Sequence, residues 1–79
     1  MSRNNLILVV KDKRHNKEWY YVFANLDADC HWNARYVKKL IHDGTYRRTK
    51  CRATALLLAH NKQKRINTEY GVREITITF

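Results

Sequence analysis

The sequence contains no proline and only two glycines, Gly44 and Gly71. Linkers between domains are commonly rich in these residues, so their scarcity gives no sign of a flexible joint. We also find no internal repeat in the 79 residues. A chain of this length forms only a thin hydrophobic core and has too few residues for a second core. We therefore predict a single domain over residues 1–79.

Cysteine and long apolar runs are equally scarce. Two cysteines, Cys30 and Cys51, are too few for a disulfide scaffold, and no C-x2-C pair begins a zinc site. The apolar run that follows the N-terminus, residues 6–10, is too short for a signal peptide or a membrane-spanning helix. We expect a reduced, cytoplasmic protein with no membrane partner, no metal and no cofactor.

Acidic residues are few: 7 Asp and Glu stand against 16 Lys and Arg, which leaves a formal charge of +9. This balance excludes an acidic mimic of nucleic acid. Like charges at this density repel one another, so we expect an anionic partner that neutralises part of them. Hydrophobic residues still make up 44% of the chain, which indicates a folded core rather than disorder.

Two short apolar runs in the first part of the chain predict a β-hairpin. Residues 6–10 and 19–23 are rich in β-branched or aromatic side chains and are too short for helices. The first run is apolar at every position, which predicts a strand covered on both faces and suits the centre of a sheet. The polar stretch between the runs contains Asn16, which tolerates the left-handed conformation of a tight loop.

Helical spacing of apolar residues replaces strand character in the middle of the chain. Asp27 or Asp29 is a candidate N-cap, and Gly44 a candidate C-cap, for a helix over residues 29–43. We expect a second helix to begin near Thr49 as its N-cap and to be most buried in its apolar middle.

The C-terminal stretch, residues 73–79, alternates between apolar and polar side chains. This alternation predicts a half-buried strand, which we expect to be antiparallel. The elements then follow in the order β-β-α-α-β. The simplest packing is a small two-layer α+β domain, in which both helices cover one face of a three-stranded, mainly antiparallel sheet.

The basic residues gather in three clusters. The cluster at the end of the second helix, Lys62, Lys64 and Arg65, is explained by the helix dipole, which favours cations at a C-terminus. The tip of the hairpin carries a second cluster, which can lie along a nucleic-acid backbone as two-stranded ribbons do. Its members are Lys11, Lys13, Arg14 and Lys17.

The third cluster lies where the second helix is expected to begin. Its polar and basic side chains are Tyr46, Arg47, Arg48, Thr49, Lys50 and Arg52. Cations at a helix N-terminus oppose the dipole at a cost of about 0.3–1 kcal/mol each, so folding does not explain them. Free backbone N–H groups, guanidinium groups and hydroxyls together have the chemistry of a phosphate-binding site.

Aromatic side chains are the other candidates for recognition. Trp19, Tyr20 and Tyr21 are consecutive in the second predicted strand, so the side chain of Tyr20 points to one face of the sheet and those of Trp19 and Tyr21 to the other. If one face of the sheet is left uncovered, rings on that face are available for stacking on bases or for a protein interface.

These features favour a small, non-catalytic protein that binds DNA or RNA through phosphate contacts of the helix N-terminus and the hairpin tip. One alternative is an interaction or inhibitor factor, such as small viral proteins provide, that docks on an acidic surface of a host nucleic-acid enzyme. A second alternative is a small toxin-like endoribonuclease with His15, His31 or His60 as acid–base groups. The sequence predicts no particular oligomeric state.

Overall fold

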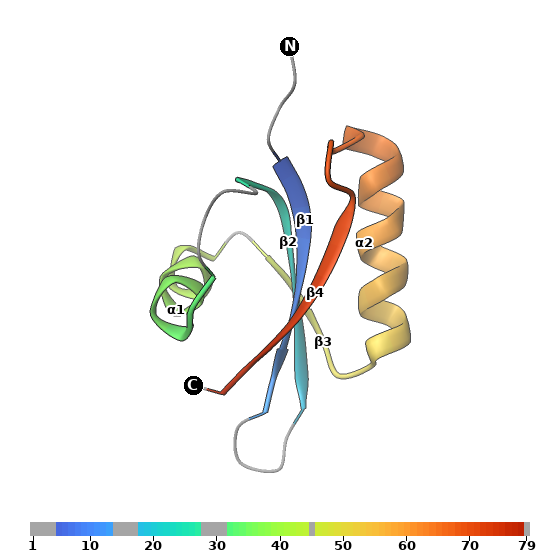
Figure 1. Ribbon diagram of the computed structural model, residues 1–79. Helices are drawn as coiled ribbons and strands as arrows, with labels where there is room; N and C mark the ends of the chain where they lie inside the picture. Colours follow the sequence, from blue (N-terminus) through green and yellow to red (C-terminus); the bar gives the residue numbers. More distant parts are fainter. Residues whose placement is uncertain (1–4, 14–17, 28–31, 45, 79) are drawn as a thin grey trace.

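The computed structural model describes most of the chain: residues 5–13, 18–27, 32–44 and 46–78. Strand β1 (Asn5–Asp12) pairs antiparallel with β2 (Trp19–Asp27), so the predicted pairing of the two apolar runs is confirmed. Two helices and two further strands complete an α+β fold with a four-stranded mixed sheet (Figure 1).

The sheet has one strand more than the sequence predicted. Strand β3 (Arg47–Thr49) pairs antiparallel with β2, and β4 (Val72–Ile77) pairs parallel with β1, which gives the order β3-β2-β1-β4. The sequence did not reveal β3 because three polar residues carry no apolar alternation. The expected antiparallel orientation of the C-terminal strand is wrong, because a helix returns the chain along the sheet before β4 begins (Figure 1).

Strand β1 lies inside the sheet and is buried on both faces, as its continuous apolar run predicted. Residues 6–10 all have an exposed fraction of 0%. The even-numbered residues from Leu6 to Val10 belong to one core cluster, and Ile7 and Val9 belong to a second cluster on the other face. The run has no polar position because neither face of β1 meets water.

The two helices lie on opposite faces of the sheet (Figure 1). Helix α1 (Ala34–Asp43) packs through the buried Val37, and α2 (Arg52–Ile66) packs through the buried Ala55 and Ala59. The predicted two-layer packing with both helices on one face is therefore wrong. A strand that is apolar on both sides needs cover on both sides, and one helix supplies each cover.

Helix α1 begins later than the sequence predicted and ends where it predicted. Its N-cap is Asn33, whose Oδ1 accepts a hydrogen bond from the backbone N–H of Tyr36 at 2.9 Å. Asp27 belongs to β2, and Asp29 lies outside the described residues. Gly44 ends the helix with φ of +79°, the left-handed conformation for which glycine is preferred.

The apolar middle of α2 is buried along one stripe only. Ala55 and Ala59 have an exposed fraction of 0%, whereas Leu57 is 61% exposed. The small alanine side chains let the helix approach the sheet closely. Of the described helices, neither combines the length and the apolar character that crossing a bilayer requires.

Candidate functional site

The cations expected around the start of the second helix lie mainly on the edge strand β3. Arg47 and Arg48 belong to β3, Lys50 lies in the connection, and only Arg52 belongs to α2. Pairing with Tyr20–Val22 of β2 holds Arg47 and Arg48 in a strand, so these two do not lie at the helix N-terminus as predicted. Lys50 and Arg52 do lie there, on either side of the N-cap, Cys51. Because successive side chains of a strand alternate, Arg47 and Arg48 project from opposite faces of the sheet.

Arg48 and Lys50 lie over the ring of Trp19 on the α1 face. The Arg48 Cζ is 4.2 Å from the ring centroid, and the Lys50 Nζ is 4.9 Å from it. At these distances the negative face of the ring attracts both cations. We call Trp19, Arg48 and Lys50 the Trp19 stack. It stands beside the base of the hairpin, because Trp19 is the first residue of β2.

Of the three aromatic residues considered for stacking on bases, only Trp19 is partly exposed. Tyr20 is 4% exposed and packs in the cluster under α2, and Tyr21 is 3% exposed in the cluster under α1. Neither tyrosine ring is accessible to a base, because the sheet is covered on both faces. Tyr46 also packs inward, with its ring centroid 5.2 Å from that of Tyr21.

Arg52 is neutralised within the chain by Glu74 of β4. Its Nε and Nη2 donate to the two carboxylate oxygens of Glu74 at 2.9 and 2.8 Å. These hydrogen bonds raise the pKa of Arg52 and lower the pKa of Glu74. The hydroxyl of Thr49 is also used locally, since it accepts from the backbone N–H of Cys51 at 3.2 Å. Both predicted site residues thus have internal partners.

Half of the predicted hairpin cluster falls on described residues. The Lys11 Nζ is 3.6 Å from a carboxylate oxygen of Glu18, so its charge is partly compensated. Lys13 is exposed at the end of β1. Arg14 and Lys17 lie outside the described residues.

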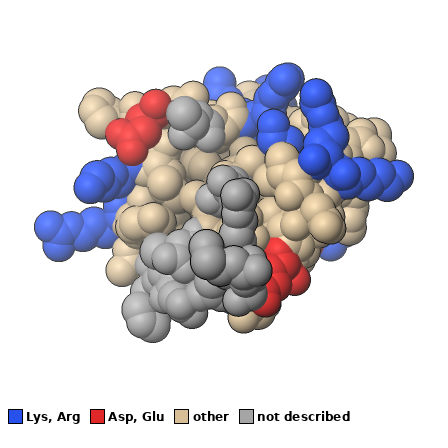
Figure 2. All heavy atoms as spheres, turned by 90° about the horizontal axis from the view of Figure 1, so that it is seen from above, with Lys and Arg blue, Asp and Glu red and all other residues tan. Residues whose placement is uncertain are grey.

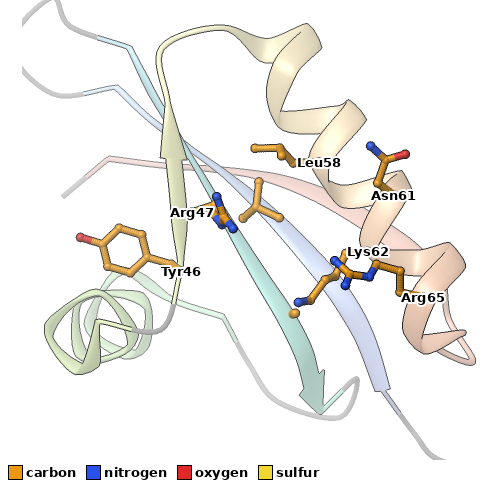
Figure 3. Close-up of a pocket in the computed structure, with 8 residues that line it drawn as sticks. Tyr46, Arg47, Leu58, Asn61, Lys62 and Arg65 are labelled. Atoms are coloured by element: carbon orange, nitrogen blue, oxygen red, sulfur yellow. The ribbon is translucent and has the colours of Figure 1, made fainter.

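Arg47 faces α2 and lines a groove between that helix and the strands β2 and β3 (Figure 3). The groove has a volume of about 380 Å³. We call it the basic groove. Its lining residues are Val22, Ala24, Tyr46, Arg47, Leu58, Asn61, Lys62 and Arg65.

The charge of the basic groove has one sign. Arg47 comes from β3 and Lys62 and Arg65 from α2, and the lining contains no Asp or Glu. No ion pair between these three cations and a carboxylate occurs in the described part of the chain. Lys62 and Arg65 are three residues apart on one helix face, where like charges repel. The site therefore concentrates positive charge that nothing in the described structure neutralises.

Two of the groove cations were missed as site residues at the sequence level. At that level the helix dipole explains Lys62 and Arg65 without any ligand. A signal was nevertheless present, because Leu58, Lys62 and Arg65 follow the spacing i, i+4, i+7 that places residues on one helix face. The spacing alone does not reveal that Arg47 lies opposite that face.

Three cations of α1 lie on the other side of the sheet from the groove. Arg35, Lys38 and Lys39 are exposed residues of α1, on the opposite side of the sheet. Viewed from above, Lys and Arg side chains project from the left and from the upper right of the molecule, the sides on which α1 and α2 lie (Figure 2). The overall charge thus gives no preference for one face, whereas the groove does.

One of the three candidate catalytic histidines, His60, falls on the described residues. The described residues contain no group of three or more His, Cys, Asp or Glu that could hold a metal ion. His60 is exposed on α2 and does not line the basic groove. The other two candidate histidines, His15 and His31, lie outside the described residues.

Comparisons with family models, with curated proteins and with solved structures found no match to this chain.

Proposed function

We propose that this chain is a small, non-catalytic nucleic-acid-binding protein whose basic groove and Trp19 stack contact the phosphate backbone. The observation that carries the proposal is that Arg47, Lys62 and Arg65 line one groove, whose lining contains no acidic residue. Guanidinium groups bind phosphate oxygens through paired N–H donors, and lysine adds a point charge. Such contacts provide most of the affinity in nucleic-acid binding and depend little on sequence.

The position of β3 supports an extended contact. It is an edge strand, so a long ligand can lie along it without displacing another strand. Arg47 projects to the face that carries the basic groove, and Arg48 projects to the face that carries the Trp19 stack. A phosphate backbone that follows this edge meets cations on both of its sides.

The energetics of the fold favour the same interpretation. Arg52 and Lys11 each have a carboxylate neighbour, Glu74 and Glu18 respectively. In contrast, the lining of the groove contains no charged residue besides Arg47, Lys62 and Arg65. Like charges that line one groove repel one another, and a bound phosphate would reverse the sign of that interaction.

The test is a salt titration of binding to single-stranded and double-stranded DNA and RNA. We expect binding at about 50 mM salt, with log affinity falling linearly as log salt rises. Replacing Arg47, Lys62 or Arg65 by alanine should weaken binding to all sequences alike and reduce the salt slope by about one each.

A matched control lies on the same helix. Lys64 is exposed on α2 but does not line the basic groove, so Lys64→Ala removes the same charge outside the site. It should lower the salt slope by less than Lys62→Ala does. Equal effects of the two variants, or no binding to any nucleic acid at about 50 mM salt, would refute the proposal.

A second candidate function is docking on an acidic protein surface. Large apolar side chains that are exposed favour it, because they are common interface anchors: Leu57 is 61% exposed and Tyr70 is 53% exposed. Capture of one stoichiometric protein partner from a nuclease-treated lysate, together with absence of oligonucleotide binding, would favour this function. Cleavage of RNA by the wild type, lost on His60→Ala, would instead favour an endoribonuclease.

A further inference from the structure

The lining of the basic groove also contains apolar side chains, Val22 and Ala24 from β2 and Leu58 from α2, which we call its apolar floor. Ala24 and Leu58 are partly exposed, whereas Val22 is buried, with an exposed fraction of 6%. Phosphate is strongly hydrated and is bound by charge and hydrogen bonds, so it draws no benefit from an apolar surface. The floor therefore suits another part of the ligand.

The dimensions of the groove limit what that part can be. Its volume of about 380 Å³ lies near the lower end of the range of about 300–1,000 Å³ found for small-molecule sites. Ala24 of β2 has the smallest side chain among the apolar lining residues, so a larger side chain there would fill part of the groove. In Figure 3, Arg47 from β3 and Lys62 and Arg65 from α2 lie on either side of this space.

A ligand with a flat ring linked through a sugar to a phosphate matches both the apolar part and the cationic part of the groove lining. We propose that the basic groove holds one nucleotide unit of a single-stranded nucleic acid. The phosphate lies on Arg47, Lys62 and Arg65, and the face of the base lies on the partly exposed Ala24 and Leu58. Nucleobases removed from a stack are held in proteins between apolar or aromatic side chains in this way.

This inference rests on the proposed function and names its substrate class. In a duplex each base face is covered by the neighbouring pair, so it cannot reach the floor of a groove. Phosphates remain available in both forms. Single strands should therefore use the cations and the floor, whereas duplexes should use the cations alone.

A larger side chain at position 24 separates the contribution of the apolar floor to binding affinity from the contribution of the cations. Ala24→Leu adds bulk to the groove without changing any charge. We expect it to weaken binding of a single-stranded 12-mer by about fivefold or more and to leave binding of the duplex unchanged. Arg47→Ala should weaken both. The smaller Ala24→Val gives the same pattern with a lesser effect, and circular dichroism of each variant checks that the fold is retained.

The outcomes of this experiment are distinct. If Ala24→Leu and Ala24→Val leave single-strand affinity unchanged while Arg47→Ala lowers it, the nucleotide site is refuted and the proposed function stands. If no oligonucleotide binds to the wild type, the proposed function itself fails. Loss of duplex binding equal to loss of single-strand binding in folded Ala24→Leu also refutes the preference for single strands.

A second measurement locates the base directly. Adenosine 5′-monophosphate added to the wild type should shift the methyl NMR signals of Val22, Ala24 and Leu58, and inorganic phosphate should shift them much less. Unmoved methyl signals refute the site. Binding of the mononucleotide without binding of any oligonucleotide assigns the groove to free nucleotides and overturns the strand assignment.

Discussion

Replacing Val37 by alanine should weaken the attachment of α1 to the sheet without affecting the basic groove. Val37 is the buried residue of α1 and has an exposed fraction of 0%. It packs in the cluster on the α1 face, whereas the groove lies between α2 and the opposite face. The substitution therefore separates the stability of one layer from the contacts proposed for the basic groove on the other.

The magnitude follows from the two methyl groups that are lost. Each buried methyl contributes about 0.8 kcal/mol, and an open cavity adds up to about 1 kcal/mol. Alanine recovers about 0.5 kcal/mol through its higher helix propensity. The net loss is about 2 kcal/mol, which is a large part of the roughly 4–12 kcal/mol expected for a chain of this size.

Urea unfolding followed by tryptophan fluorescence measures this loss, because Trp32 packs against the α1 cluster. The control is Lys38→Ala on the exposed side of the same helix, which should change stability by less than about 0.5 kcal/mol. The loss of oligonucleotide affinity caused by Arg47→Ala should be the same in folded Val37→Ala as in the wild type. A stability change below about 0.5 kcal/mol, or a smaller effect of Arg47→Ala in that background, would refute the division of the two faces.

Three further predictions concern local features. Gly44→Ala should lower the free energy of unfolding by about 1 kcal/mol in thermal melts, because φ of +79° strains an alanine although no atom lies within 4 Å of the added Cβ. Glu74→Gln should destabilise the protein at neutral pH, and the difference from wild type should vanish in acid. The bond to Arg52 lowers the folded-state pKa of Glu74, so its stabilisation is present above the unfolded pKa and is lost as pH falls through the folded pKa. The exposed Cys51 should react with iodoacetamide at lower pH than an ordinary thiol, because hydrogen bonds from the backbone and side chain of Thr54 lower its pKa; unchanged pH dependence in peptide-mapped alkylation would contradict this.

Local features of the fold were predictable because they depend on neighbouring residues. The apolar run 6–10 indicated a strand buried on both faces, and Gly44 indicated a helix end, and both are confirmed. The parallel pairing of β4 was not predictable, because the path of α2 across the sheet determines its direction. Nor was β3, whose three residues are extended only because β2 offers a free edge.

The sequence by itself determined that this chain is strongly basic, that residues 6–10 form a strand buried on both faces, and that Arg47 belongs to a cluster of basic residues. Only the tertiary structure decided which cations share a site. Strand alternation separated Arg47 from Arg48, Glu74 neutralised Arg52, and the packing of α2 brought Lys62 and Arg65 opposite Arg47. Charge is a property of composition, but its concentration in one groove depends on contacts between segments that are distant in the chain.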